Sequence, residues 1–270
     1  AVKKLNVPLS GKDMARCGGI TSMMRLPIAS SLDGLDACFV GVPIDIGVSN
    51  RPGARYSFFP GNYRRMITIR QSPFLSPRQL PPANPSKQSP QFGPREIRNQ
   101  SVVVHEYNVA TGAAPFQHLM VADVGDVWVN LYNLPDICWS IRESFSKIIK
   151  NGCVPITAGG DHTITYPILQ AVAAKHGPVG LVHVDAHGDC ADLMLGEKIA
   201  HGTSFRRAVE EGLLDTKRVV QIGLRGSDYF GENNKFQRDN GFRIIPATEC
   251  WHKSLTPLMH EVRQQMGDRP

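Results

Sequence analysis

From residue 135 onward, apolar positions switch between the spacing of a helix and that of a buried strand. Ile137, Ile141, Phe145 and Ile148 recur at helical spacing, which predicts a helix over residues 135–152. The pattern continues with predicted strands at 153–157, 179–184, 219–224 and 242–245, and with predicted helices at 164–175, 204–214 and 254–266. Parallel strands joined through single helices make right-handed crossovers. The second half of the chain therefore predicts an α/β protein with a parallel sheet.

The first half holds two more predicted strands and one segment of different character. Apolar runs at 37–43 and 119–127 predict the strands. Residues 56–91 contain seven of the 20 prolines and show no helical period. Such a stretch buries little surface, so we predict a disordered surface insert within a single domain over 1–270. A proline-rich segment that binds a partner is the alternative interpretation.

The positive charge of the chain is concentrated in this insert. The formal net charge is +6, and residues 56–91 hold five basic residues and no acidic ones, which leaves +1 for the rest. We therefore expect no nucleic-acid-binding face. An insert that binds RNA or an acidic partner is the weaker hypothesis. No apolar run is long enough to span a membrane, so no membrane partner is expected.

The cysteines predict free thiols in a reducing compartment. There are six of them, they are scattered, and none forms a C-x-x-C pair. Cys190 lies beside a cluster of polar residues, where we interpret it as a small apolar filler.

That polar cluster is the main candidate for chemistry. The pentad Asp185-Ala186-His187-Gly188-Asp189 directly follows the apolar run 179–184. In an extended segment alternate side chains share a face, so we expect Asp185, His187 and Asp189 to project to one side. Gly159-Gly160-Asp161-His162 follows the strand one unit upstream. Sites in open parallel sheets gather at the carboxyl ends of strands, and we expect these two strands to be neighbours. His162, Asp185, His187 and Asp189 are thus predicted to meet.

Carboxylates and imidazoles without thiolates favour Mn²⁺, Zn²⁺, Fe²⁺ or Co²⁺ over Ca²⁺. Bridging carboxylates suit two ions roughly 3.5–4 Å apart, which together lower the pKa of a shared water. His183 lies deeper in the strand, and we interpret it as a buried, hydrogen-bonded histidine rather than a ligand. His201, in His201-Gly202-Thr203, opens the next helix, and either a cap or a proton shuttle fits that place.

These motifs resemble those of the ureohydrolases, the family of arginase and agmatinase. The surrounding sequence is closer to agmatinase. Asn50-Arg51-Pro52-Gly53-Ala54-Arg55 resembles the start of an agmatinase stretch whose continuation appears at residues 92–98. The insert thus splits a stretch that is continuous in the family. The chain is especially similar to vertebrate mitochondrial agmatinase-like proteins, also described as guanidino acid hydrolases.

The resemblance implies a three-layer α/β/α fold around a mainly parallel sheet and a binuclear Mn²⁺ centre. By position, His162, Asp185 and Asp189 hold one ion, Asp185 bridges, and His187 binds the second. His201 matches the proton-shuttle histidine. The implied reaction is attack of a metal-bridging hydroxide on a guanidino carbon, in agmatine or in a guanidino acid such as 4-guanidinobutyrate. A homo-oligomer and a mitochondrial location are implied as well.

One motif of the family is missing from this sequence, and its absence changes what the resemblance predicts. The later family motif S-x-D-x-D-x-x-D-P does not occur, and no Asp-x-Asp follows His201. The resemblance therefore predicts a chain truncated at its C-terminus, without its last strands and with an incomplete second metal site. Losing ligands weakens metal binding. The alternative hypothesis is a catalytically incomplete form that binds at most one metal or co-assembles with intact subunits.

Overall fold

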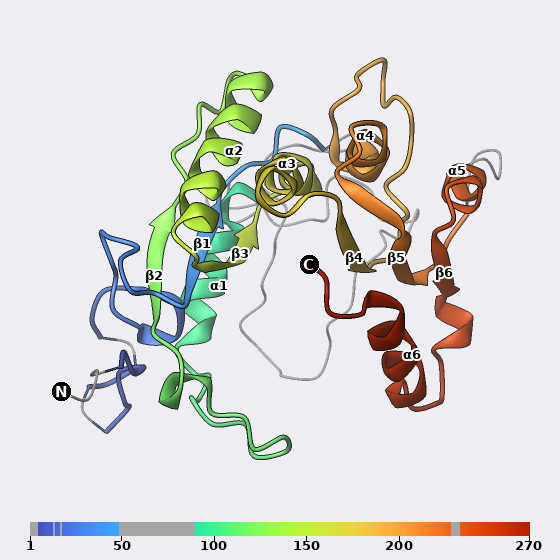
Figure 1. Cartoon of the computed structure of the whole chain (residues 1–270). Helices are drawn as coiled ribbons and strands as arrows, with labels where there is room; N and C mark the ends of the chain where they lie inside the picture. The colour runs from blue at the N-terminus through green and yellow to red at the C-terminus, as the bar shows by residue number, and fades with distance from the viewer. Residues whose placement is uncertain (1–4, 13, 17, 49–89, 228–232) are drawn as a thin grey trace, which may run out of the picture.

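The computed structural model describes residues 5–12, 14–16, 18–48, 90–227 and 233–270 (Figure 1). Most of the predicted insert, 56–91, and the motif at 50–55 lie outside these described residues. The continuation of that motif begins in η3 (Pro90–Phe92) and forms α1 (Gly93–Ser101).

The first sheet places a central strand between two parallel neighbours. β1 (Ala37–Val42) pairs with β2 (Val121–Asp126) on one side and with β3 (Val154–Gly159) on the other. Helix α2 (Leu134–Lys150) packs on one face of this sheet, where fully buried Ile137, Ile141 and Phe145 meet the β1 side chains. The predicted helix at 135–152 is thereby confirmed, with Asn133 accepting a hydrogen bond from the Asp136 amide at its start.

Helix α1 lies on the opposite face of the first sheet. One close approach is at Gly41 of β1, where a built Cβ would lie 2.8 Å from the Pro94 Cβ atom. Arg98 of α1 joins this face through two hydrogen bonds to the buried Asp123 carboxylate, from Nε at 2.7 Å and from Nη2 at 2.9 Å. With α2 and α1 on opposite faces, the first sheet is the middle of three layers.

The second sheet repeats the arrangement with β4 (Val179–Val184), β5 (Leu214–Leu224) and β6 (Arg243–Pro246), all parallel. Helices α3 (Thr165–His176) and α4 (Ser204–Glu210) cover one face, where the core includes Phe205. Helix α6 (Thr256–Met266) covers the other face through Val262. Figure 1 shows α6 on the side of the strands opposite to α3 and α4, and α5 (Asn233–Asp239) beside β6.

β3 and β4 are not hydrogen-bonded neighbours in the described part of the chain, so this part of the prediction is wrong. Each has one partner only, β1 for β3 and β5 for β4. Apolar side chains on both strands are exposed: Val154, Ile156, Val182 and Val184. A helix between two strands fixes their direction but not their adjacency, and here α3 spans the separation between the two sheets (Figure 1).

Element boundaries differ from the predictions in the second half. The helix expected at 204–214 ends at Glu210, and β5 begins at Leu214 rather than at residue 219. Helices α1 and α5 are short and polar, and the apolar pattern did not predict them. Among the described residues, Cys38, Cys138, Cys153, Cys190 and Cys250 are free, as predicted. No helix in the described ranges has the length and apolar character needed to cross a membrane.

Candidate metal centre

His162 stands directly after the carboxyl end of β3. It opens the short 3-10 helix η5 (His162–Ile164), whose N-cap is Asp161. The Asp161 carboxylate accepts hydrogen bonds from the amides of Thr163, at 2.8 Å, and Gly47, at 2.9 Å. Asp161 therefore fixes both the turn that presents His162 and the loop that follows β1.

The pentad leaves the carboxyl end of β4 as a loop rather than as an extended strand. β4 ends at Val184, and the Asp185 carboxylate accepts a hydrogen bond from the His187 amide at 2.9 Å. Asp189 has a φ of 50°, in the left-handed region that residues with side chains rarely adopt. The expectation that alternation alone would place three side chains on one side was wrong, because the backbone turns within the pentad.

Four side chains of this region converge. Ligand atoms of His162, His183, Asp185 and Asp189 all lie within 4.8 Å of one another. Nδ1 of His162 is 2.5 Å from Oδ2 of Asp189 and 3.8 Å from Oδ2 of Asp185. Residues from the ends of two strands in separate sheets thus meet, although the strands themselves are not paired.

His187, the fourth predicted ligand, lies outside this group of four. Its side chain is 78% exposed, and its Nδ1 atom is 3.6 Å from Oδ1 of Asp185. The ring therefore borders the other oxygen of the Asp185 carboxylate. His183, predicted to be buried and hydrogen-bonded, is 6% exposed, and its Nδ1 lies 3.1 Å from Nε2 of Gln221.

Electrostatic interactions shift the pKa values of both Asp185 and His162. Burial by itself raises the pKa of Asp185, but the neighbouring His183 imidazole, the hydrogen bond from the His187 amide and the nearby His162 hold that pKa well below its usual range. Burial lowers the pKa of His162, whereas Asp189 and Asp185 raise it, and the net pKa lies above its ordinary value. The Asp185 carboxylate is thus ionised at neutral pH, as a cation ligand must be.

Aromatic packing holds the two histidines of the group. The Phe205 ring is 1% exposed, and its centroid lies 5.6 Å from that of His162 and 4.5 Å from that of His183. Phe205 belongs to α4, and its amide donates to the Asp189 carbonyl at 3.1 Å. The start of α4 therefore supports both the imidazoles and the end of the pentad. Cys190, next to Asp189, is buried, and burial raises the pKa of its thiol, in agreement with its interpretation as a filler.

His201 is placed by the loop after β1. It opens η6 (His201–Thr203), a 3-10 helix that packs against η5. The Gly47 carbonyl lies 2.8 Å from Nδ1 of His201 and also accepts from the His201 amide at 3.1 Å. A carbonyl only accepts, so Nδ1 carries a proton, and in the neutral ring Nε2 holds the lone pair. A Cβ at Gly47 would lie 1.9 Å from Oγ1 of Thr163, so this close approach requires glycine.

Sequence reasoning missed the residues that support the candidate ligands. Asp161 was seen only as part of a motif, and Gly47 not at all. Gln221 was overlooked, although a glutamine among Val219, Val220 and Ile222 is a polar interruption in a buried strand and was a usable signal. Buried polar side chains need partners, and that requirement could have marked it.

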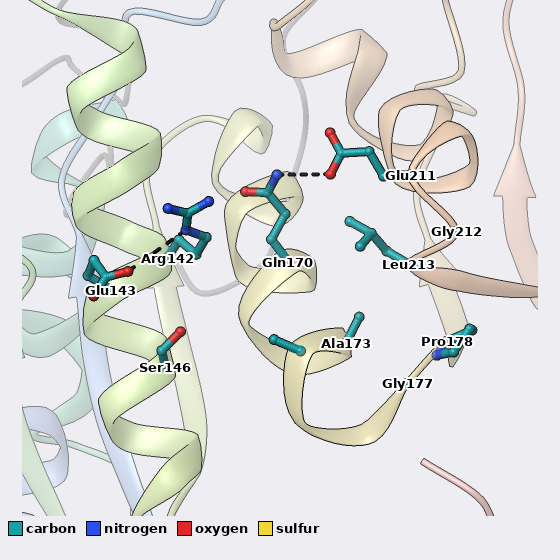
Figure 2. A pocket seen from close by; sticks show the side chains of 11 residues that line it. Arg142, Glu143, Ser146, Gln170, Ala173, Gly177, Pro178, Glu211, Gly212 and Leu213 are labelled. Carbon is teal, nitrogen blue, oxygen red and sulfur yellow. Dashed lines mark hydrogen bonds and ion pairs between the residues drawn. The ribbon is translucent and has the colours of Figure 1, made fainter.

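One surface hollow in the described part of the chain lies away from these residues. Figure 2 shows it between α2, α3 and the turns before β4 and β5, with a volume of about 560 Å³ and with Arg142, Gln170 and Glu211 among its lining residues. It therefore borders the amino ends of the strands, opposite to the edge that carries His162 and Asp185. None of the candidate site residues lines it.

Comparison with known proteins agrees with this geometry. Residues 79–270 match the sequence pattern of the arginase family. The chain belongs to the arginase family. The chicken (Gallus gallus) protein named "Agmatinase, mitochondrial" is 58% identical over 267 residues, covering 99% of this chain and 68% of the relative. The human (Homo sapiens) "Guanidino acid hydrolase, mitochondrial" is 54% identical over 265 residues, covering 98% of this chain and 65% of the relative.

The arginase-family fold is also seen in a solved structure. Proclavaminate amidino hydrolase from Streptomyces clavuligerus superposes with a TM-score of 0.76 at 28% sequence identity, covering 95% of this chain and 73% of the other. This likeness supports the three-layer α/β/α architecture expected from the sequence. The chain spans about two thirds of the length of the two relatives compared above.

Arginase-family membership implies a binuclear metal centre, typically with Mn²⁺, and the residues present fit such ions. Asp185 and Asp189 supply carboxylates and His162 supplies an imidazole within 4.8 Å, a donor set suited to a divalent cation of the Mn²⁺ type. The Asp185 carboxylate faces His162 through Oδ2 and His187 through Oδ1. Each oxygen of the Asp185 carboxylate therefore has an imidazole beside it.

Proposed function

We propose that this protein is a metal-dependent hydrolase that cleaves the guanidino group of a small linear substrate and releases urea. The convergence of His162, Asp185 and Asp189 at the carboxyl ends of β3 and β4 is the observation that carries the proposal. The two relatives named for agmatine and for guanidino acids both point to a guanidinium as the shared chemical group.

In this proposal the four predicted ligands divide between two Mn²⁺ ions. His162, Asp185 and Asp189 would hold one, and Asp185 would be shared with the second, which His187 would bind. When bound, the ions would supply Lewis acidity and hydroxide at neutral pH. The side chain of Asp189 is 8% exposed and those of His162 and Asp185 are 30% exposed, whereas that of His187 is 78% exposed, so His187 is the most exposed of the four proposed ligands.

His201 is proposed to move the proton that the reaction requires. Its Nδ1–H is held by the Gly47 carbonyl, which leaves Nε2 as the atom that accepts a proton and returns it. The leaving amine needs that proton, because an amide anion is too basic to depart. The loop from β1 therefore sets both the orientation and the tautomer of the proposed shuttle.

The site residues select for the guanidino end of the substrate. Carboxylates favour a cationic guanidinium, which agmatine and 4-guanidinobutyrate share. We propose that linear guanidino compounds are the substrate class and that the protein is mitochondrial, as the names of its relatives suggest. We also propose that it is homo-oligomeric, because members of the arginase family are multimeric.

Urea release tests the proposal. The purified protein, incubated with Mn²⁺ and with agmatine, 4-guanidinobutyrate or arginine, is expected to release urea from at least one of them, and a chelator should abolish the release. The Asp185→Asn variant should be inactive, whereas Asp192→Asn, changed at an exposed carboxylate outside the group, should keep the activity. A folded protein that binds Mn²⁺ but releases no urea from any guanidino compound would show the proposal to be wrong.

A further inference from the structure

A chain of buried amides and one imidazole runs beneath the pentad. Gln221 on β5 and Gln237 on α5 are 0% exposed, and His183 on β4 is 6% exposed. The Gln237 amide Nε2 donates to Oε1 of Gln221. Nε2 of Gln221 then lies 2.8 Å from the Gly188 carbonyl and 3.1 Å from Nδ1 of His183. The hydrogen bonds therefore lead from Gln237 through Gln221 to Nδ1 of His183.

This chain determines where the proton of His183 sits. The Gly188 carbonyl only accepts hydrogen bonds, so the Gln221 atom that faces it must be the amide nitrogen. The same nitrogen directs its second hydrogen at Nδ1 of His183, which must therefore be the acceptor. In the neutral imidazole the proton is then on Nε2.

The protonated Nε2 atom faces Asp185. It is buried and has no hydrogen-bond partner among the described residues, and Oδ2 of Asp185 lies 3.5 Å away. This is the same oxygen that lies 3.8 Å from Nδ1 of His162. A hydrogen bond from Nε2 to this oxygen requires only a small shift of the carboxylate.

We propose that His183 is a positioning residue that donates a hydrogen bond from Nε2 to Asp185, in the tautomer imposed by Gln221, and thereby fixes the carboxylate for metal binding. This inference rests on the proposed function of the site. In this arrangement His183 is not itself a metal ligand, although its ring lies within the same 4.8 Å group. With the Nδ1 lone pair engaged by Gln221 and the proton on Nε2, the ring has no lone pair to offer a cation.

The same glutamine fixes the far end of the pentad. Its bond to the Gly188 carbonyl holds the residue next to Asp189, and a Cβ at Gly188 would lie 2.4 Å from Nε2 of Gln237. Gln221 thus secures Asp185 through His183 and secures Asp189 through the backbone. Hydrogen-bond partners of metal ligands typically contribute about 10–100-fold to metal affinity.

The tautomer is tested directly by NMR. A long-range ¹H–¹⁵N spectrum of the ¹⁵N-labelled, metal-free protein separates protonated from unprotonated ring nitrogens, and the His183 signals are assigned from their absence in a His183→Gln sample. The expected spectrum has a protonated Nε2 and an unprotonated Nδ1. A protonated Nδ1 in neutral His183 would overturn the inference, whatever the protein does with Mn²⁺.

Two variants test the positioning role. His183→Gln places an amide donor near the Nε2 position, whereas His183→Leu removes the donor at similar volume. Mn²⁺ affinity is measured for each by EPR of the free ion, beside thermal unfolding of the metal-free proteins. We expect His183→Leu to bind Mn²⁺ about 10–100-fold more weakly than wild type, and His183→Gln to stay within a few-fold of it.

These measurements test the positioning role of His183 separately from the proposed function of the site. Equal Mn²⁺ affinity in wild type and His183→Leu would refute the positioning role, and so would an equal loss in both variants, which is the behaviour of a ligand. Wild-type protein that binds no Mn²⁺ would instead refute the proposed function, and the NMR result on the tautomer would still stand by itself.

Discussion

Replacing Arg98 with Met is expected to destabilise the protein strongly. The Arg98 guanidinium is buried and makes two hydrogen bonds to Asp123, one to Asp126 at 2.5 Å and one to the Gly125 carbonyl at 2.8 Å. Methionine fills similar space but leaves the Asp123 carboxylate, in a residue 1% exposed, without its countercharge. This ion pair joins α1 to β2, so its loss weakens the contact between a covering helix and the first sheet.

The size of the loss in unfolding free energy depends on the hydrogen bonds that Asp123 keeps. Removing one partner of a buried pair costs about 3–5 kcal/mol. Asp123 keeps hydrogen bonds from the amides of Met23, at 2.7 Å, and Gly125, at 2.9 Å, and Asp126 is 41% exposed and reaches solvent. We therefore expect the lower end, about 3 kcal/mol, which for a domain of this size lowers the melting temperature by roughly 6–12 °C.

Urea unfolding followed by circular dichroism measures the loss. The matched control is Lys235→Met, which removes an ion pair with Asp239 whose side chains are 69% and 56% exposed and which should cost about 0–1 kcal/mol. The double variant Arg98→Met/Asp123→Asn should recover part of the stability, because it removes the stranded charge. A loss below about 1 kcal/mol for Arg98→Met, or a loss no larger than that of the control, would refute the reasoning.

Three further predictions concern pH, the proposed shuttle and the loop after β1. Burial raises the pKa of Asp123, but the hydrogen bonds from Arg98, Met23 and Gly125 outweigh it, and the net pKa is lowered. Its contribution to stability is therefore present above the unfolded pKa of about 3.9 and is lost as pH falls through the folded value. The stability gap between wild type and Arg98→Met should accordingly narrow in unfolding titrations from pH 7 to pH 3, and a constant gap would contradict this. His201→Asn keeps a donor for the Gly47 carbonyl but has no base, so kcat for urea release should fall by about 10²–10⁴ while EPR shows unchanged Mn²⁺ affinity; a kcat within a few-fold of wild type would remove His201 from the mechanism. Gly47→Ala would place a Cβ 1.9 Å from Thr163 Oγ1 and should cost about 1–3 kcal/mol as well as most of the activity. Gly18→Ala, whose Cβ would lie at an ordinary 3.4 Å from its nearest neighbour, should change stability by less than about 0.5 kcal/mol in the same thermal and urea-release assays.

Local periodicity predicted the elements that bury a clear apolar face. The stripe of Ile137, Ile141 and Phe145 gives α2, and the run at 179–184 gives β4. Short, polar α1 bears no such stripe, because its attachment comes from Arg98 and from close backbone contact at Gly93. A nine-residue helix that is attached mainly through a buried arginine offers few apolar positions from which it could be predicted.

The motifs predicted which side chains approach one another but not how the backbone brings them there. Asp185 and His162 follow strands that belong to separate sheets. Asp189 joins the group because its own backbone is in the left-handed region, not because of strand alternation. The partners of His183 were beyond local reasoning, since Gln221 is 38 residues away and Gln237 lies on α5, which the apolar pattern did not predict. Long-range hydrogen bonds depend on the tertiary arrangement, which no short window contains.

Anomalous diffraction at the manganese absorption edge, from crystals grown with Mn²⁺, would locate the ions. We expect an anomalous peak coordinated by His162, Asp185 and Asp189 at the carboxyl ends of β3 and β4, with His183 outside the coordination sphere. A manganese-bound crystal without a peak at these residues, or with a peak that His183 coordinates in place of Asp185, would contradict this expectation.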